Sequence, residues 1–318
     1  MGSGFKSSLY ACLHLMPDWM RRVTDDYKEE ACGVREWGLH LLEKQGRAAV
    51  WAVSAELGVR APGVAALACR LVERYLYSQM RHFESRQIQR FQQGLRSRIP
   101  ALIASCVQIA AKSNSAAISL SASQVCSYLF RQGVHHSVKD VVTWEYHVFQ
   151  TIDYRVPLWT SVEVAELLAV QARLPPTLLE PLGIVVNLAE YKRDRLDRRV
   201  RWVANVSPHS SNSSSCDEPS ASARARALTV RTAHLAAGAV AACARYFGRS
   251  RPTLELHLAS YINVPLSYVE CLRDSILTEA IIEDTHDVCK RRRSLRDSIL
   301  AEAIMDDSYD GCKRRRYE

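Results

Sequence analysis

The sequence predicts an all-α protein, and three observations lead to this prediction. Apolar residues recur at helical spacing along most of the chain, capping signals precede several of these segments, and no stretch alternates convincingly between apolar and polar residues as a strand does. The chain has 318 residues, of which 47% are hydrophobic and 24% are charged. This balance is typical of globular proteins with a buried core, and it argues against a disordered or collagen-like chain.

Three segments show the helical period most clearly. Residues 64–76 and 141–152 each place apolar side chains along one face of an amphipathic helix. Residues 95–110 are apolar nearly all round, which predicts a central, buried helix. Pro100 either begins that helix or kinks it, because its ring removes a backbone donor.

Capping boxes mark the expected starts of helices. In this motif a Ser or Thr side chain and an acid or Gln three residues later each satisfy a free backbone N–H. The pattern occurs at Ser121/Gln124, Ser137/Asp140, Thr160/Glu163, Thr177/Glu180 and Ser294/Asp297. Gly133 and Pro157 lie between the predicted helices, where breaks are expected.

One polar segment interrupts the helical pattern. Residues 207–227 contain eight Ser and two Pro, so we expect a disordered loop within a helical domain. Ser207 is a candidate for proline-directed phosphorylation, because it precedes Pro208 at the start of this loop. This is the only Ser-Pro or Thr-Pro pair in the chain. A phosphate there would add negative charge near the basic stretch 192–201. That stretch is either a solvated helix face or a docking surface for acidic protein or nucleic acid.

The C-terminal tail is an internal repeat. Residues 272–293 and 295–316 are identical at 16 of 22 positions. Two copies are too few for a solenoid, so we expect the first copy to close the folded body and the second to fray. Each copy ends in a basic block that is a candidate nuclear-import signal. The residues of the two blocks are Lys290, Arg291, Arg292, Arg293, Lys313, Arg314, Arg315 and Arg316.

Composition narrows the partners that are expected. The formal net charge of +8 allows an acidic or nucleic-acid partner, but the tail carries none of the excess, so direct nucleic-acid contact ranks below protein contact. No apolar run reaches the roughly 20 residues that cross a bilayer, so no membrane contact is expected. The ten cysteines lack zinc-site spacing, which predicts reduced thiols and no metal or other cofactor.

We find no catalytic motif in the sequence. A phosphate-binding glycine loop, a His-Glu-x-x-His motif, a Gly-x-Ser-x-Gly motif and the kinase signature set are all absent. The adjacent His135 and His136 would point about 100° apart on a helix and are a poor metal pair. They are expected in a polar turn before Ser137. The sequence therefore predicts a binding protein and not an enzyme.

The segment from Val64 to Pro157 resembles a cyclin box. Residues 64–76 end in Glu-Arg-Tyr-Leu, similar to the acid-Arg-aromatic-Leu end of the second cyclin helix. Residues 101–112 (ALIASCVQIAAK) are similar to the central third helix, and residues 144–163 to the fifth helix and the exit from the box. The resemblance implies a cyclin-like helical bundle.

The same resemblance suggests two contact residues. Cyclins contact their kinase through a Lys at the end of the third helix and a Glu in the fifth, and these positions fall on Lys112 and Glu145. Ordinary solvated charges are the alternative. Residues 113–115 depart from the aromatic-Glu-Glu of cyclins, and no Met-Arg-x-x-Leu patch is recognisable between residues 35 and 57. Substrate docking of the ordinary cyclin type is therefore not expected.

Residues 45–280 are similar, more closely, to the cyclin N-terminal domain-containing proteins of meiosis. The segments SCVQIAAK, IDYRVPLWTSVEVAELL and AHLAAGAVAACARYF carry this similarity, together with LHLASYINVPLSYVECLRDSIL. The resemblance implies one cyclin box followed by a second, divergent cyclin-like half. The expected units are an N-terminal segment 1–34, a box 35–157, a second half 158–271 that includes the Ser-rich loop, and the tail 272–318.

The resemblance also implies a role. Such proteins are nuclear factors on meiotic chromosomes, which promote crossover designation and maturation through contacts with the crossover machinery. One alternative is a regulatory cyclin that binds and activates a cyclin-dependent kinase. Another is a helical protein that binds DNA directly through its basic residues.

Overall fold

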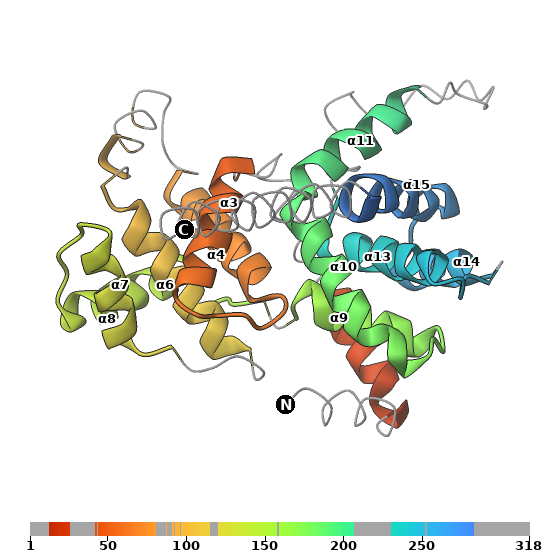
Figure 1. Ribbon diagram of the computed structural model, residues 1–318, viewed down its shortest axis with the longest axis horizontal. Coiled ribbons are helices and arrows are strands. Elements are labelled where there is room, and N and C mark those ends of the chain that lie inside the picture. Colours follow the sequence, from red (N-terminus) through yellow and green to blue (C-terminus); the bar gives the residue numbers. More distant parts are fainter. Residues whose placement is uncertain are drawn as a thin grey trace, which may run out of the picture.

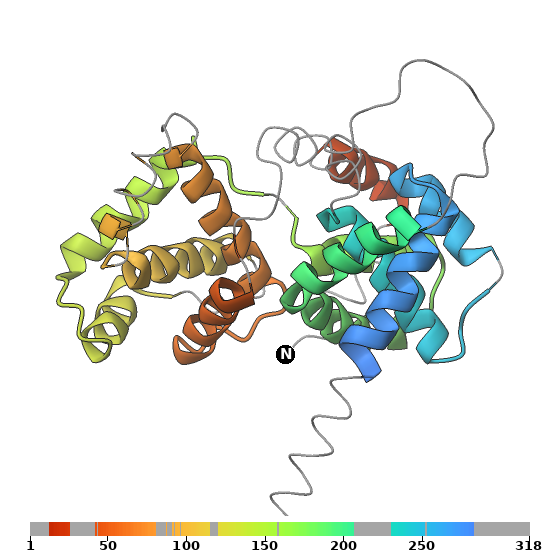
Figure 2. The same cartoon turned by 90° about the horizontal axis from the view of Figure 1, so that it is seen from above.

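The computed structural model describes residues 13–25, 42, 44–80, 87, 91, 93–95, 97–114, 120–157, 159–206, 230–251 and 253–282. Over these residues the chain forms helices and turns without any strand, which confirms the all-α prediction. Figures 1 and 2 show the helices gathered in two bundles that lie side by side. Each bundle has its own hydrophobic core.

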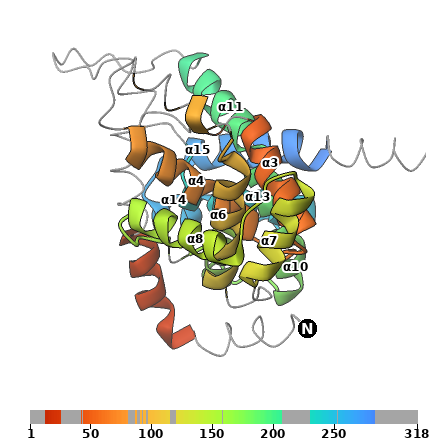
Figure 3. The ribbon, with the colours of Figure 1, turned by 90° about the vertical axis from the view of Figure 1, so that its left-hand side faces the viewer.

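The first bundle is built around one central helix. Its helices are α3 (Lys44–Glu56), α4 (Val64–Met80), α6 (Ile99–Ser113), α7 (Ala122–Arg131) and α8 (Val138–Thr151). Figure 3 shows α6 in the middle, and α6 packs against each of the other four. Every residue from 101 to 111 is buried, which confirms the predicted central helix.

The start of α6 differs from the periodic pattern. The apolar spacing predicted a helix from Leu95, but a turn occupies residues 97–98 and α6 begins at Ile99. Pro100 lies in the first turn of the helix, where its missing N–H would have no helical partner in any case. Of the two roles expected for Pro100, the structure therefore shows the start of the helix.

The second bundle repeats the plan of the first. The five helices that follow this plan are α9 (Ser161–Gln171), α10 (Leu179–Tyr191), α13 (Thr232–Tyr246), α14 (Leu254–Ile262) and α15 (Leu266–Ile276). The third of the five, α13, packs against the other four and is buried from Thr232 to Ala244. In both bundles the third helix is thus the core of the unit.

Small side chains let α13 occupy the centre. Its sequence is rich in Ala, and Gly238 lies where α15 approaches most closely. A Cβ atom at Gly238 would lie 2.8 Å from Cβ of Leu272, a distance that real Cβ atoms do not reach. The absence of a side chain at Gly238 therefore sets how closely α13 and α15 can pack.

Further elements complete the second bundle. Helix α11 (Arg193–Val206) follows α10 and packs against α10 and α15. A 3₁₀ turn, η2 (Pro176–Leu178), precedes α10, and a π-helical segment, η3 (Leu277–Ile282), continues α15. A helix over residues 16–25 also packs on this bundle through Met16 and Val23.

Three of the predicted capping boxes are present. Ser121, Ser137 and Thr160 each accept from the backbone three residues on, and the Gln or acid at that position bonds back to the cap. The hydrogen bonds from Ser137 hold the pKa of the Asp140 carboxyl below its usual range. The structure therefore confirms the start signals of α7, α8 and α9.

A fourth capping box was predicted wrongly. Thr177 lies inside η2, and α10 begins after Leu178 without a side-chain cap. The reason is Pro176, which begins a 3₁₀ turn before the α-helix can start. The fifth pair, Ser294/Asp297, and the Ser-rich residues 207–227 lie outside the described residues.

The Glu-Arg-Tyr-Leu run of α4 ties the first bundle together. The Glu73 carboxylate accepts from the buried Arg47 guanidinium at 3.1 Å. Arg74 donates to the carbonyl of Arg155 at 2.6 Å, and the Tyr75 hydroxyl lies 3.2 Å from Nε2 of His147. These contacts join α4 to α3, to α8 and to the segment that leaves the bundle.

A small set of contacts joins the two bundles. The backbone N–H of Gly63 donates to Oδ1 of Asn187 at 3.1 Å, and the rings of Trp51 and Tyr191 meet edge to face with centroids 5.6 Å apart. Gly63 has φ +84°, and a Cβ atom there would lie 2.8 Å from Cβ of Thr160. The joint therefore needs glycine for both its backbone conformation and its space.

The first copy of the tail repeat begins inside the second bundle. Leu272 and Ile276 belong to α15, and both are fully buried in its core. The described part of the repeat ends at Ile282, and the second copy lies outside the described residues.

The cysteines of the described residues are free thiols. Burial raises the pKa of Cys69 and Cys106 well above the usual range, and it raises the pKa of Cys243 to about 11. These three thiols therefore stay protonated near neutral pH and pack as small apolar groups.

Replacing Gly238 by Ala tests the close packing of α13 and α15. We expect the free energy of unfolding to fall by about 1–3 kcal/mol, because the new methyl group would overlap Leu272. Gly183→Ala in α10 is the matched control, since its Cβ would meet only Cγ1 of Val162, at 3.7 Å. The control should gain about 0.5–1 kcal/mol from removal of a helical glycine. Urea unfolding followed by circular dichroism measures both, and an unchanged stability of Gly238→Ala would contradict the packing.

Candidate partner-binding sites

The two contact residues suggested by the resemblance form an ion pair with each other. Lys112 lies in the last turn of α6, and Glu145 lies in the middle of α8. The Lys112 Nζ atom is 2.6 Å from Oε1 and 2.8 Å from Oε2 of Glu145. The Lys112 side chain is 44% exposed and the Glu145 side chain 10% exposed, so the ammonium group is the part that a partner can reach.

The packing of the two helices produces this pair. Val141 and Val148 are buried and anchor α8 on the core of the bundle. Glu145 is four residues after one and three before the other, so helical geometry turns it toward α6. A cation at the C-terminal end of α6 also interacts favourably with the helix dipole. Fold and local electrostatics therefore hold both charges in place.

The outward face of α8 carries exposed apolar side chains. Val138, Val142 and Tyr146 follow one another at a spacing of four residues and are 45%, 51% and 58% exposed. The hydroxyl of Tyr154, another exposed residue, donates to that of Tyr146 at 3.2 Å. We call these four residues the α8 stripe. Apolar anchors beside a charged pair are the combination that a protein partner uses at an interface.

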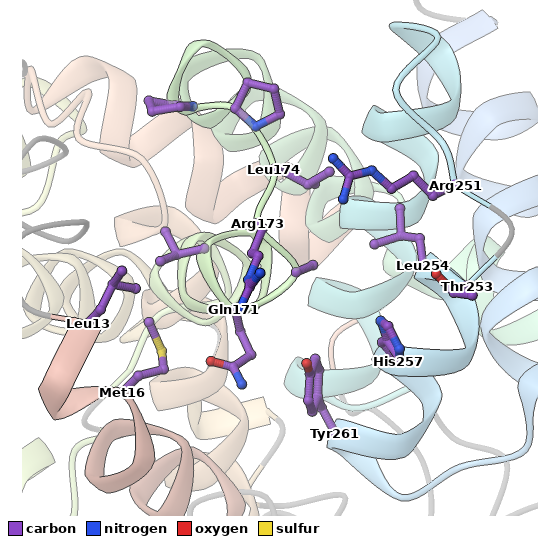
Figure 4. A pocket seen from close by; sticks show the side chains of 14 residues that line it. Leu13, Met16, Gln171, Arg173, Leu174, Arg251, Thr253, Leu254, His257 and Tyr261 are labelled. Atoms are coloured by element: carbon purple, nitrogen blue, oxygen red, sulfur yellow. The ribbon is translucent and has the colours of Figure 1, made fainter.

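A second site is a pocket in the second bundle. The pocket has a volume of about 930 Å³ and lies between the N-terminal helix, the end of α9 and α14. Figure 4 shows Leu13 and Met16 on one side, His257 and Tyr261 of α14 on the other, and Arg173 between them. We call it the arginine pocket.

The lining of the arginine pocket is apolar and cationic. Met16, Leu174 and Leu254 supply buried apolar surface, while Arg173 and Arg251 are exposed. No acidic side chain is among the described residues that line it. The pocket is therefore complementary to a peptide that carries an apolar anchor beside a carboxylate.

The end of α9 positions Arg173. This residue has φ +55°, the left-handed conformation that commonly ends a helix, and its N–H donates to the carbonyl of Val170 at 2.9 Å. No sequence pattern predicted the arginine pocket. Three segments far apart in the chain assemble it, and no local motif marks any of them.

The basic stretch 192–201 was expected to be either a solvated helix face or a docking surface, and the structure shows a third role for it inside the second bundle. Arg193 is buried, and its guanidinium donates to the carbonyl of Val230 at 2.6 and 3.2 Å and pairs with Glu190 at 3.3 Å. The Asp197 carboxylate accepts from the N–H of Val230 at 2.6 Å. The inner face of α11 therefore holds the start of α13, and the description as a solvated face was wrong for these residues.

The outer side of α11 is paired within the chain as well. Arg195 and Arg199 lie 3.7 and 3.9 Å from the Glu279 carboxylate, and Arg198 pairs with Asp194 at 3.2 Å. These pairs reduce the positive charge that α11 could offer to a nucleic acid.

The remaining candidates divide into described and undescribed residues. His135 packs its ring on Phe130 with centroids 5.1 Å apart, and the carbonyl of His136 accepts from Sγ of Cys126 at 2.9 Å. Both lie in the non-helical segment before Ser137, although the turn itself covers residues 132–133 and not the two histidines. Ser207 and the two basic blocks, residues 290–293 and 313–316, lie outside the described residues.

Within the described ranges, no three or more His, Cys, Asp or Glu side chains are placed to hold a metal ion. None of the helices in these ranges is long and apolar enough to span a membrane. No protein-family model, curated protein or solved structure matches this chain. Its function is therefore inferred from the two repeated bundles and from the chemistry of these two sites.

Removal of either charge tests the difference in burial between the exposed Lys112 and the nearly buried Glu145. Lys112→Met leaves a nearly buried carboxylate without its partner, so we expect a loss of about 1–2 kcal/mol in unfolding free energy. Glu145→Gln leaves an ammonium group that water reaches, and the loss should be about 0.5 kcal/mol. Lys139→Met, on an exposed position of α8, is the control and should change little. Equal losses in thermal unfolding for the first two variants would contradict this geometry.

Proposed function

We propose that this chain is a nuclear cyclin-like adaptor, which acts on meiotic chromosomes and promotes crossover designation and maturation through contacts with other proteins. The observation that carries the proposal is the repeated bundle. Each half contains five helices in the same order, and the third of them is buried among the other four. This is the arrangement that the resemblance of residues 45–280 to cyclin-type proteins implies. In the proposal the chain has no catalytic role of its own, and the two basic blocks act in nuclear import.

The placement of the two sites supports an adaptor. The ion pair and the α8 stripe belong to the first bundle, whereas the arginine pocket belongs to the second. Two partners can therefore bind at the same time without competing for one surface. The sites also differ in chemistry, because one offers apolar anchors on a helix and the other offers two guanidinium groups around an apolar floor. Such a difference lets each site select its own partner.

One observation favours activation of a cyclin-dependent kinase as the second candidate. Lys112 and Glu145, which the resemblance suggests as kinase contacts, are in direct contact beside the α8 stripe. In that role the pair and the stripe would hold the regulatory helix of the kinase, so that the Lys–Glu pair of the kinase itself could form. The arginine pocket would then be free for a further protein.

Two double variants separate these functions. Lys112→Glu with Glu145→Lys keeps an ion pair between α6 and α8 but reverses both charges toward a partner. Arg173→Glu with Arg251→Glu reverses the charge of the arginine pocket at exposed positions. Each tagged variant is isolated from meiotic cells, and the proteins that accompany it are quantified by mass spectrometry.

We expect recombination proteins to accompany the wild-type chain. With the Arg173/Arg251 variant their recovery should fall by roughly 10-fold or more, since reversed charges at an interface oppose binding. Arg198→Glu, at a 73% exposed position outside both sites, is the control. A kinase that is recovered by the wild type and lost only with the Lys112/Glu145 reversal would favour the second candidate. Absence of recombination proteins from the wild-type sample would contradict the adaptor proposal.

A further inference from the structure

The first copy of the tail repeat fills a defined seat on the second bundle. Leu272 and Ile276 are fully buried, and Ser275 and Ile281 are nearly so. Helix α13 supplies the floor of this seat, and α11 and α14 also pack against α15. We call the surface that receives residues 272–282 the α15 seat.

Charged groups on both sides fix how the first copy lies. Arg273 Nη1 is 2.9 Å from the Glu255 carboxylate of α14. Glu279 lies near Arg195 and Arg199 of α11, and its carbonyl accepts a hydrogen bond from Lys192. The seat therefore recognises an Arg at one point and a Glu six residues later, with buried aliphatic side chains between them.

The second copy repeats the side chains that make these contacts. Each residue of the first copy that is buried in the seat or ion-paired to it recurs unchanged 23 positions later. The recurring residues are Leu295, Arg296, Ser298, Ile299, Glu302 and Ile304. Within residues 272–282 only Thr278 and Ile282 are replaced, by Ala and Met, and Thr278 is exposed. The second copy thus carries every recognition element of the first.

We propose that the α15 seat accepts either copy, and that residues 295–305 compete with residues 272–282 for it within one chain. The tether between the copies is short, so the second copy is present at an effective concentration of about millimolar. The proposal does not depend on the meiotic role and holds for any function of the two bundles.

The residues that precede each copy decide which one occupies the seat at rest. Val269 is fully buried, and the Tyr268 hydroxyl lies 3.0 Å from Nδ1 of His234. The residues 23 positions later are Arg292 and Arg291, which cannot fill an apolar site. The first copy is therefore favoured, by roughly 10- to 100-fold for the burial of Val269 alone.

Exchange of the copies has a consequence for partners. When the second copy occupies the seat, Tyr268 and Val269 leave α13, and the first copy becomes available outside the bundle. A partner that binds the first copy can then withdraw it while the core of the bundle stays covered. Because the tail is duplicated, the chain can release the first copy to a partner without unfolding the second bundle.

Three variants of the full-length chain test the exchange. In Leu272→Asp the second copy should take the seat, so hydrogen exchange at the buried amides of α13 should quicken only about 10- to 100-fold. Leu295→Asp should change nothing, because the first copy already occupies the seat. The double variant leaves no usable copy, and its α13 protection should fall by a further factor of about 10³. Equal protection in Leu272→Asp and the double variant would overturn the proposal.

A charge exchange gives a second test that does not depend on a destabilised core. Glu255→Arg with Arg296→Glu favours the second copy in the seat, whereas Glu255→Arg with Arg273→Glu favours the first and is the matched control. We expect maleimide to label Cys271 at least about 10-fold faster in the former variant, because α15 leaves the bundle. Cys243 should stay protected in both variants. Labelling of Cys243 together with Cys271 would show that the bundle unfolds and that the copies do not exchange. Equal rates of Cys271 labelling in the two double variants would also contradict the exchange.

Discussion

Each bundle depends on a helix that has no face left for water. The backbone groups of α6 and α13 are paired within the helix, so burial on all sides requires that their side chains be apolar, small or, as for Gln108 and His234, hydrogen-bonded. In α13 this requirement reaches its limit at Gly238, where even one methyl group would meet Leu272. The four surrounding helices take their positions from this central element, and so do the surfaces that they present.

Central burial also determines where partners can bind. A helix such as α6 can contact a partner only at its ends, and Lys112 lies in its last turn. The other candidate surfaces belong to surrounding elements, namely α8, α14 and the end of α9 at Arg173. The same principle applies to Arg193 of α11, which turns inward and holds the start of α13. Binding chemistry is therefore confined to the outer layer of both bundles.

Local patterns predicted the parts of the fold that local physics controls. The burial of α6 followed from an apolar pattern on all sides, and the caps at Ser121, Ser137 and Thr160 followed from the spacing of their partners. The box at Thr177 failed because Pro176 imposed a 3₁₀ turn that outweighs a cap. The resemblance pointed to Lys112 and Glu145, although no pattern showed that they touch each other. The arginine pocket and the buried Arg193 could not be predicted, because each depends on groups that only the tertiary fold brings together.

The described residues form two separate cores, each organised by its own third helix. Native-state hydrogen exchange of the wild-type chain, resolved by peptide, tests this arrangement. We expect the amides of α6 and α13 to exchange most slowly, and we expect added urea to release them as two groups at different concentrations. Protection that is greatest in peripheral helices such as α7 or α11, or a single transition shared by α6 and α13, would contradict it.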